Sequence, residues 1–255
     1  MHAVDTVGKH VLRGLVKFGS RSRPHIDRFL AHNSKVGDTA LFANDQFAWT
    51  KLLEENWHEI DQEMRAVLRH RDAVPPLRDI SPDHSRIAAD GRWRSFFLWA
   101  YGIKSDENTQ RCPRTTEIIE QIPGLKTALF SILAPGANIP RHTGVTKALV
   151  VCHLGLKIPS DRPACTMWLD GQTLQWQPGK SFVFDDTYPH EVHNDTDEER
   201  VVLLLQVKRP MRWPGQMLAN FFLSAIRISP FITDARKELG RWETKFKRSE
   251  RRNQD

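Results

Sequence analysis

Two hydrophobic patterns divide the chain. In its first part, apolar residues recur at every third or fourth position, most clearly over residues 46–70. This spacing gives a helix with one apolar face, so one continuous helix is predicted there. A second, shorter helix is predicted over Thr115–Ile122, because Pro123-Gly124 follows directly and proline cannot continue a helix.

From about Ser95 onward the pattern changes to short apolar runs that are separated by turn residues. Asp170-Gly171 lies between two such runs and is a strong signal for a β-hairpin. Many short strands at this spacing predict a mainly β fold, an antiparallel sandwich or jelly roll, flanked by N-terminal and C-terminal helices. The expected strands are Phe96–Tyr101, Thr127–Leu133, Ala148–Leu156, Met167–Leu169, Thr173–Trp176, Ser181–Phe184 and Val201–Val207.

Charge is distributed unevenly along the chain. Residues 1–36 carry seven Lys/Arg and two Asp/Glu, a net charge of +5, and residues 201–255 carry twelve and five, a net charge of +7. The residues between them have a net charge of −6, which gives +6 for the whole chain. After Pro210 the helical spacing also returns. The helix predicted there has an apolar face that consists of Met217, Leu218, Phe221, Phe222, Ala225 and Ile226.

Cations beside an apolar helix face suit the surface of an anionic membrane. An ordinary core helix with a solvated basic tail is the alternative. We expect a basic amphipathic arm over 1–36, a jelly-roll domain with N-terminal helices over 37–212, and a basic amphipathic helical tail over 213–255.

The composition excludes several classes of protein. With 255 residues, 40% hydrophobic and 27% charged, the chain can fold around a core. Three cysteines without a Cys-x-x-Cys pair favour a reducing compartment, the cytoplasm, over a disulfide scaffold. No apolar run reaches the roughly 20 residues of a membrane-spanning helix, and the N-terminus lacks a signal-peptide pattern. The basic ends carry no nucleic-acid-binding motif, so no nucleic acid partner is expected.

Three of the eleven histidines occupy informative positions. His142 follows a Pro-Gly turn, His153 lies inside the predicted strand 148–156, and His190 follows the predicted strand 181–184. In a jelly roll such strands can converge on one cavity, where two neutral imidazoles can bind Fe, Zn, Cu or Ni. For each histidine alone, a structural role or an exposed loop position is the alternative.

Arg200 begins the most apolar predicted strand, Val201–Val207. A buried guanidinium requires an anionic partner, because an unpaired buried charge is very costly. The partner could be a carboxylate of the protein, Glu198 or Asp185. A dicarboxylate cosubstrate could equally supply it through a bidentate pair.

Together these residues form a pattern that resembles the aspartyl/asparaginyl β-hydroxylases, from about Leu129 to Arg212. That family consists of iron(II)- and 2-oxoglutarate-dependent dioxygenases on a double-stranded β-helix, a cupin-like jelly roll. The residues that carry the resemblance are Ser131, His142-Thr143-Gly144, His153-Leu154-Gly155-Leu156, Phe184-Asp185-Asp186, His190-Glu191-Val192 and Arg200.

The resemblance implies a role for each residue. His142 and His190 would bind iron, and Arg200 would bind the distal carboxylate of 2-oxoglutarate with the help of Ser131. His153 would be a second contact to this cosubstrate. Gly144 stands where most such oxygenases have a carboxylate ligand, and in this family water fills that position. Asp185 and Asp186 are candidates for holding the imidazoles in place, although Asp185 could equally be a strand-end cap.

The resemblance leaves the substrate open. Peptide-hydroxylating members carry an arginine two residues before the His-Leu-Gly-Leu histidine, whereas this chain has Val151 there, and Leu149 is apolar too. With the basic ends, this favours a hydroxylase that uses O2 on an acyl chain of a bacterial membrane lipid, of lipid A or ornithine lipid type, peripherally at the cytoplasmic membrane face. The alternatives are a β-hydroxylase of Asp or Asn in a peptide or carrier-bound amino acid, and a metal-binding cupin without enzymatic activity.

Overall fold

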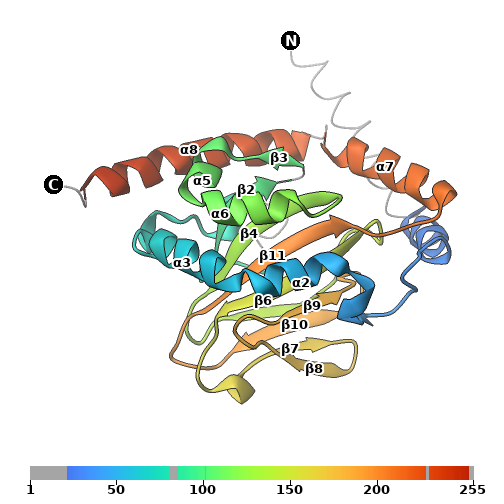
Figure 1. The fold of residues 1–255 in the computed structure, drawn as a ribbon, viewed down its shortest axis with the longest axis horizontal. Coiled ribbons are helices and arrows are strands. Elements are labelled where there is room, and N and C mark those ends of the chain that lie inside the picture. The colour runs from blue at the N-terminus through green and yellow to red at the C-terminus, as the bar shows by residue number, and fades with distance from the viewer. Residues whose placement is uncertain (1–21, 81–85, 101, 228–229, 253–255) are drawn as a thin grey trace, which may run out of the picture.

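A computed structural model describes residues 22–80, 86–100, 102–227 and 230–252. Its strands form two antiparallel sheets, with the orders β1-β9-β6-β11-β4-β2-β3 and β5-β10-β7-β8 (Figure 1). The larger sheet contains β1 (Leu41–Phe42), β2 (Trp93–Ala100), β3 (Ile103–Lys104), β4 (Leu125–Leu133), β6 (Leu149–Lys157), β9 (Ser181–Phe184) and β11 (Arg200–Lys208). The smaller sheet contains β5 (Asn138–His142), β7 (Cys165–Leu169), β8 (Gln172–Gln175) and β10 (His190–Asn194).

The connections between these strands follow the path of a double-stranded β-helix. From β4 to β11 the chain crosses between the two sheets at each step except the β7–β8 hairpin. Asp170 and Gly171 make that hairpin turn with φ values of 44° and 89°, which is the left-handed conformation that tight hairpins require. The predicted jelly roll and the predicted hairpin are both confirmed.

Helices cover the outer face of the larger sheet (Figure 1), and short 3-10 turns connect parts of the described chain. The helices are α2 (Ala48–Glu55), α3 (Trp57–Leu68), α4 (Leu77–Ile80), α5 (Asp106–Arg111), α6 (Pro113–Glu120), α7 (Trp213–Arg227) and α8 (Pro230–Arg252). Residues 22–32 are also helical. The 3-10 turns lie at Asn44–Gln46, Arg71–Ala73 and Arg162–Ala164.

One core lies between the helices and the outer face of the larger sheet. Ile60 and Met64 of α3 and Ile119 of α6 pack with Leu203 and Leu205 of β11, and all five side chains are fully buried. A second core, between the two sheets, contains the alternate residues of the same strands. Both faces of β11 are therefore covered, which explains why its sequence is apolar almost without interruption.

The prediction of one helix over 46–70 is wrong in one respect. The helix breaks at Asn56, whose backbone (φ −111°, ψ 17°) leaves the α region, and α2 and α3 are separate helices. The side-chain amide of Asn56 donates to the carbonyl of Leu52 at 2.8 Å. An asparagine amide that competes for backbone hydrogen bonds commonly ends a helix, although the apolar spacing continues across the break.

The two C-terminal helices pack differently. In α7 only Gly215 and Ala219 are fully buried, and Ala219 packs with the helical segment 22–32 beside it (Figure 1). In α8, Trp242 contacts the core between the sheets and Phe246 belongs to the outer core. No helix in the described part of the chain is both long enough and apolar enough to cross a membrane. Most of the predicted 1–36 arm lies outside the described residues.

Candidate active site

A cavity of about 130 Å³ lies between the two sheets. Its walls combine polar side chains with apolar ones such as Phe97, Leu129 and Leu204. All five residues that the sequence singled out line this cavity: Ser131, His142, His153, His190 and Arg200. The fold therefore brings together residues from five different strands.

His142 and His190 face each other across neighbouring strands. They are register partners of β5 and β10, and their ring centroids are 4.1 Å apart. The Nδ1 atom of His142 lies 2.8 Å from the carbonyl of Pro140, and that of His190 lies 2.9 Å from the carbonyl of Tyr188. A carbonyl can only accept, so each Nδ1 carries the proton and each Nε2 is left as a metal-ligating atom.

Both imidazoles are held in the neutral form that a metal requires. Burial lowers the pKa of His142. Burial also lowers the pKa of His190 to about 4, and the neighbouring His142 adds to this effect. Near neutral pH no proton has to be displaced from either Nε2 atom.

Asp186 occupies the space beside Gly144. A methyl group added at Gly144 would overlap the carboxyl group of Asp186, which also lines the cavity. Burial raises the pKa of Asp186 to about 7, and the nearby Asp185 contributes to the rise. The carboxyl group of Asp186 thus fills the position where the Cβ of any larger residue at 144 would stand. Within the described chain, no three His, Cys, Asp or Glu residues are arranged to hold a metal ion.

Asp185 has a structural role instead of holding an imidazole. It is fully buried, accepts from Lys147 Nζ at 2.9 Å and forms an ion pair with Arg209. Its other oxygen accepts from the Thr187 backbone at 3.0 Å. The hydrogen bonds that orient the two imidazoles come from backbone carbonyls, so the expectation that Asp185 or Asp186 orients them is wrong.

Arg200 is a buried cation with no carboxylate partner among the described residues. Its side chain is 1% exposed, its Nη1 lies 3.5 Å from Ser131 Oγ, and its Nε has no hydrogen-bond partner. The protein carboxylates considered as partners bond elsewhere: Glu198 accepts from Ser160, and Asp185 pairs as described above. Burial lowers the pKa of Arg200 to about 10, so it remains charged at neutral pH.

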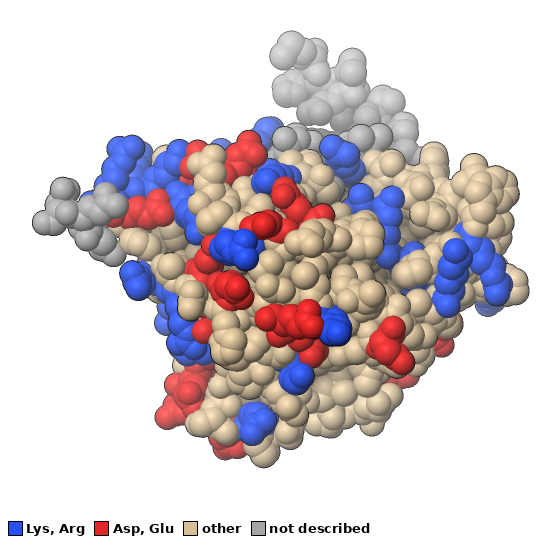
Figure 2. Space-filling view, viewed as in Figure 1, with Lys and Arg blue, Asp and Glu red and all other residues tan. Residues whose placement is uncertain are grey.

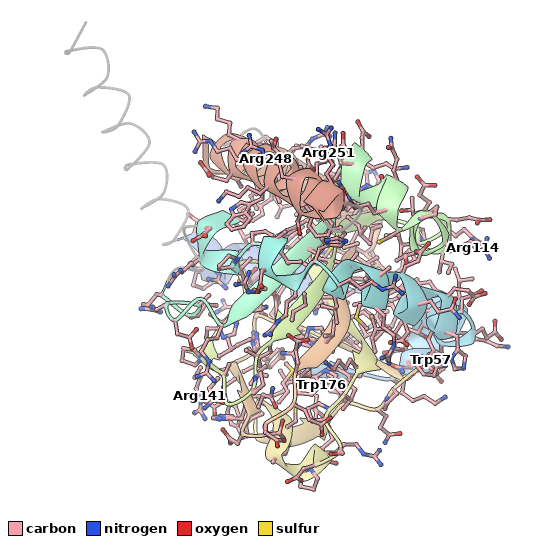
Figure 3. The ribbon with its side chains drawn as sticks, turned by 90° about the vertical axis from the view of Figure 1, so that its left-hand side faces the viewer. Trp57, Arg114, Arg141, Trp176, Arg248 and Arg251 are labelled. Carbon is pink, nitrogen blue, oxygen red and sulfur yellow. The ribbon has the colours of Figure 1, made fainter. Side chains whose placement is uncertain are left out.

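Two tryptophans complete the surroundings of Arg200, and the sequence analysis missed both. The guanidinium lies 4.7 Å from the ring of Trp176, which Figure 3 shows inside the sandwich. Trp93 Nε1 donates to Ser131 Oγ at 2.9 Å. Trp93 alternates with Ser95 and Phe97 on β2, so strand parity extended to residue 93 was the signal that could have identified it.

His153 lies in an aromatic enclosure. It is 6% exposed, its Nδ1 accepts from Trp176 Nε1 at 3.3 Å, and its ring lies 5.1 Å from that of Phe184. Burial holds the pKa of His153 well below its usual value, and Arg200 adds to this. With Nδ1 accepting, Nε2 carries the proton and is a hydrogen-bond donor.

The fold and this site define a class: a jelly roll with paired histidines facing a buried arginine. Residues 54–210 match the family model described as aspartyl/asparaginyl beta-hydroxylase. The chain belongs to this family, and it is an enzyme that hydroxylates its substrate.

Individual relatives differ in how much of the chain they cover. The ornithine lipid ester-linked acyl 2-hydroxylase of Rhizobium tropici is 35% identical over 213 residues, which are 84% of this chain and 76% of that protein. The human aspartyl/asparaginyl beta-hydroxylase is 32% identical over 171 residues, 65% of this chain but 22% of that protein. Similar solved structures include a Cupin_2 domain of an Enterobacter cloacae transcriptional regulator, with 17% identity and a TM-score of 0.31, covering 46% of this chain and 96% of that one.

Proposed function

We propose that the chain is an iron(II)- and 2-oxoglutarate-dependent dioxygenase that hydroxylates an acyl chain of a membrane lipid. The observation that carries the proposal is Arg200, a buried cation without a carboxylate partner among the described residues, in the same cavity as His142 and His190. A small dianion that also binds a metal would satisfy both features.

The residues present fit this cosubstrate and metal. His142 and His190 would hold iron through their Nε2 atoms, and Arg200 with Ser131 would hold the distal carboxylate of 2-oxoglutarate. His153, whose Nε2 is a donor, would be a second contact. Iron, 2-oxoglutarate and O2 together supply the oxidising power that inserts an oxygen atom into a C–H bond. The protein positions one carbon of the substrate and keeps water from the cavity.

The walls of the cavity favour a hydrocarbon substrate. Val151 lines the cavity, together with Leu77, Phe97, Leu129 and Leu204. Arg200 and Asp186 are the only Lys, Arg, Asp or Glu residues among the described residues of the lining. A substrate with its own carboxylate would find no further cation there, whereas an acyl chain would contact these apolar side chains. The relative from Rhizobium tropici, which is named for acyl 2-hydroxylation, supports this choice.

A membrane-contacting surface would bring such a substrate to the enzyme. Trp213, Met217 and Phe221 follow one another at four-residue steps along α7, and their exposed fractions are 73%, 56% and 74%. Figure 2 shows the surface over α7 free of Asp and Glu. We call these three side chains the α7 apolar ridge. Exposed aromatic residues in such a row are typical of insertion into a lipid interface.

Cations accompany this ridge. The pKa of Lys126 is lowered by burial and further by Lys208 and Arg227, so these three cations lie near one another. Arg227 is the last residue of α7, and Lys208 donates to Asn220 of the same helix. Three neighbouring cations beside an apolar ridge suit anionic lipid headgroups. The membrane contact would lie at the cytoplasmic face.

The first test is anaerobic binding of iron(II) and 2-oxoglutarate, followed by the visible charge-transfer band of the chelate. We expect the band in the wild-type chain and its loss in both His190→Ala and Arg200→Ala. Two residues on the outer face of the smaller sheet serve as matched controls: Arg141→Ala, at an exposed position (Figure 3), and His193→Ala, at a partly exposed one. A chain that binds iron but shows no band with 2-oxoglutarate would be a metal-binding cupin and would contradict the proposal.

The second test concerns the substrate. Succinate release should rise with ornithine lipid or lipid A in mixed micelles and should not rise with peptides that contain Asp or Asn. Stimulation by the peptides alone would replace the lipid with a peptide substrate and leave the cosubstrate assignment intact.

The third test is vesicle flotation of the full chain with anionic and neutral vesicles. The double variant Trp213→Ser/Phe221→Ser should lose binding to anionic vesicles. Trp168→Ser, a partly exposed aromatic on the outer face of the smaller sheet, should bind like the wild type. Equal flotation of all three proteins would remove α7 from the membrane contact.

A further inference from the structure

Two polar side chains face the cavity at the end away from Arg200. Thr127 is 5% exposed, lines the cavity, and its hydroxyl has no hydrogen-bond partner among the described residues. Gln206, its register partner on β11, also lines the cavity and is partly exposed. Within the described chain, its amide makes no side-chain hydrogen bond. A buried hydroxyl without a partner is costly, so a ligand that bonds it is expected.

The sheet register places this pair relative to the metal. Thr127 pairs with Gln206, Gln206 with Val151, and Val151 with Phe184. The Phe184 ring lies 5.8 Å from the ring of His190, so this row of residues leads across the sheet to the histidine pair. Ser131 lies four residues further along β4, about 13 Å from Thr127 at the usual rise of a strand.

The two ends of the cavity therefore have different chemistry. Arg200 and Ser131 form the charged end, where the cosubstrate would bind. Thr127 and Gln206 lie at the other end, beyond the reach of a cosubstrate held between Arg200 and the histidines. Their neighbours Phe97, Leu129 and Val151 are apolar. A neutral donor pair in an apolar wall matches an uncharged carbonyl that is attached to a hydrocarbon chain.

We propose that Thr127 and Gln206 donate hydrogen bonds to the carbonyl oxygen of a substrate acyl ester, and so select a neutral ester over a free carboxylate. This inference rests on the proposed function, because it assumes that the substrate enters from this end. The Thr127 hydroxyl and the Gln206 amide would fix the carbonyl. The carbons next to it would then lie near the histidine pair.

A binding experiment without turnover tests this subsite. Methyl hexanoate and hexanoate are titrated into the full chain, and ligand-detected NMR gives each dissociation constant. We expect the ester to bind more tightly than the carboxylate. Thr127→Val, which keeps the shape and removes the hydroxyl, should weaken ester binding by about 3- to 10-fold, and Gln206→Leu by a similar factor. Thr127→Ser should restore the affinity.

A matched control exists in another part of the fold. Thr115 in α6 is also fully buried, and its hydroxyl also lacks a hydrogen-bond partner among the described residues, but it does not line the cavity. Thr115→Val should leave ester binding unchanged, and melting temperatures of all variants show whether each has folded. Unchanged ester affinity in both Thr127→Val and Gln206→Leu would overturn the subsite.

Two further measurements show whether a negative result concerns the ester subsite or the proposed oxygenase function. N-acetyl-asparagine amide carries a neutral carbonyl of peptide type, and its binding in place of the ester would overturn the assignment to an acyl ester. A 2-oxoglutarate titration with iron(II) on the same samples tests the proposed function independently. If that titration shows cosubstrate binding while the ester affinities do not change, the subsite is wrong and the oxygenase stands.

Discussion

Arg200 lowers the stability of the folded protein when no ligand is bound, because its charge is buried without a carboxylate partner among the described residues. Its guanidinium contacts Trp176 and Ser131, but no carboxylate among the described residues compensates its charge. Such a residue contributes little to folding and much to binding, since an incoming dianion gains a partner that is already desolvated and oriented.

Replacing Arg200 should therefore separate stability from binding. In Arg200→Met, we expect the free energy of unfolding of the ligand-free protein to stay level or rise by about 1–3 kcal/mol, because a desolvated charge is removed. Binding of 2-oxoglutarate should weaken by about 100-fold or more, because two charge-assisted hydrogen bonds are lost. Urea unfolding and cosubstrate titration measure the two effects. A loss of more than about 2 kcal/mol in stability would show that Arg200 has a structural role.

The lowered pKa of His153 makes the stability of the protein depend on pH. Its pKa is held well below the value of 6.5 that it has when unfolded, so the unfolded chain binds more protons in the window below pH 6.5. Stability should therefore fall as the pH falls through this window. In His153→Gln that part of the slope should disappear. Unfolding free energies of metal-free protein between pH 7 and pH 5 measure it, with His193→Gln as the control. An unchanged slope would mean that His153 does not cause the loss.

At the level of elements, the site depends on two loops that meet behind the histidines. Residues 143–147 follow β5 and residues 185–189 precede β10. The backbone amide of Gly144 donates to the Asp186 carbonyl at 2.5 Å, and Lys147 pairs with Asp185. Arg23, in the helical segment 22–32, donates to the Gly144 carbonyl. These contacts keep the two histidine-bearing strand ends together.

A methyl group at Gly144 should disturb this arrangement locally. In Gly144→Ala the new Cβ would displace the carboxyl of Asp186, and we expect metal affinity to fall by about 10- to 100-fold. Isothermal titration with Mn(II) or Co(II) measures this. Gly240→Ala in α8 is the matched control, because its Cβ would meet open space and should stabilise the helix by up to about 1 kcal/mol. Wild-type metal affinity in Gly144→Ala would show that Asp186 can move without consequence.

The elements also show what a sequence can predict. Strands such as β4 and β6 were predicted because apolar residues continue along them. β5 and β10 were missed because each contains few apolar residues: Asn-Ile-Pro-Arg-His and His-Glu-Val-His-Asn. The candidate metal and cosubstrate residues were predicted from the spacing of motifs, whereas Thr127 and Gln206 line the cavity because their strand face is inward. Parity predicts this face, but not whether a hydroxyl there finds a partner.

For the molecule as a whole, the two C-terminal helices serve different purposes. α8 completes the cores, since Phe246 is 3% exposed and its ring lies 5.3 Å from that of Phe96. α7 leaves its apolar ridge uncovered. The division of the chain into an arm, a jelly-roll domain and a tail remains a prediction, but the tail contains residues on which the folded core depends.

Two phenylalanines test this difference. Phe246→Ala should reduce the free energy of unfolding by about 3–5 kcal/mol, because it leaves a cavity in the core. Phe221→Ala, at an exposed position of α7, should change it by no more than about 0.5 kcal/mol. Urea denaturation of both variants gives the comparison. Equal losses would mean that the α7 ridge is buried in solution against something, such as a second copy of the chain.

The cavity volume of about 130 Å³ has a consequence for the range of products. Cavities that enclose a whole drug-sized ligand hold about 300–1,000 Å³, so a long fatty acid cannot be enclosed here from end to end. If a lipid is the substrate, the cavity would receive only the carbons near the ester, and the far end of the chain would remain in the bilayer. The cavity itself would then not select for fatty acid length. The enzyme's hydroxylated products would be a mixture that reproduces the fatty acid composition of the membrane it works on.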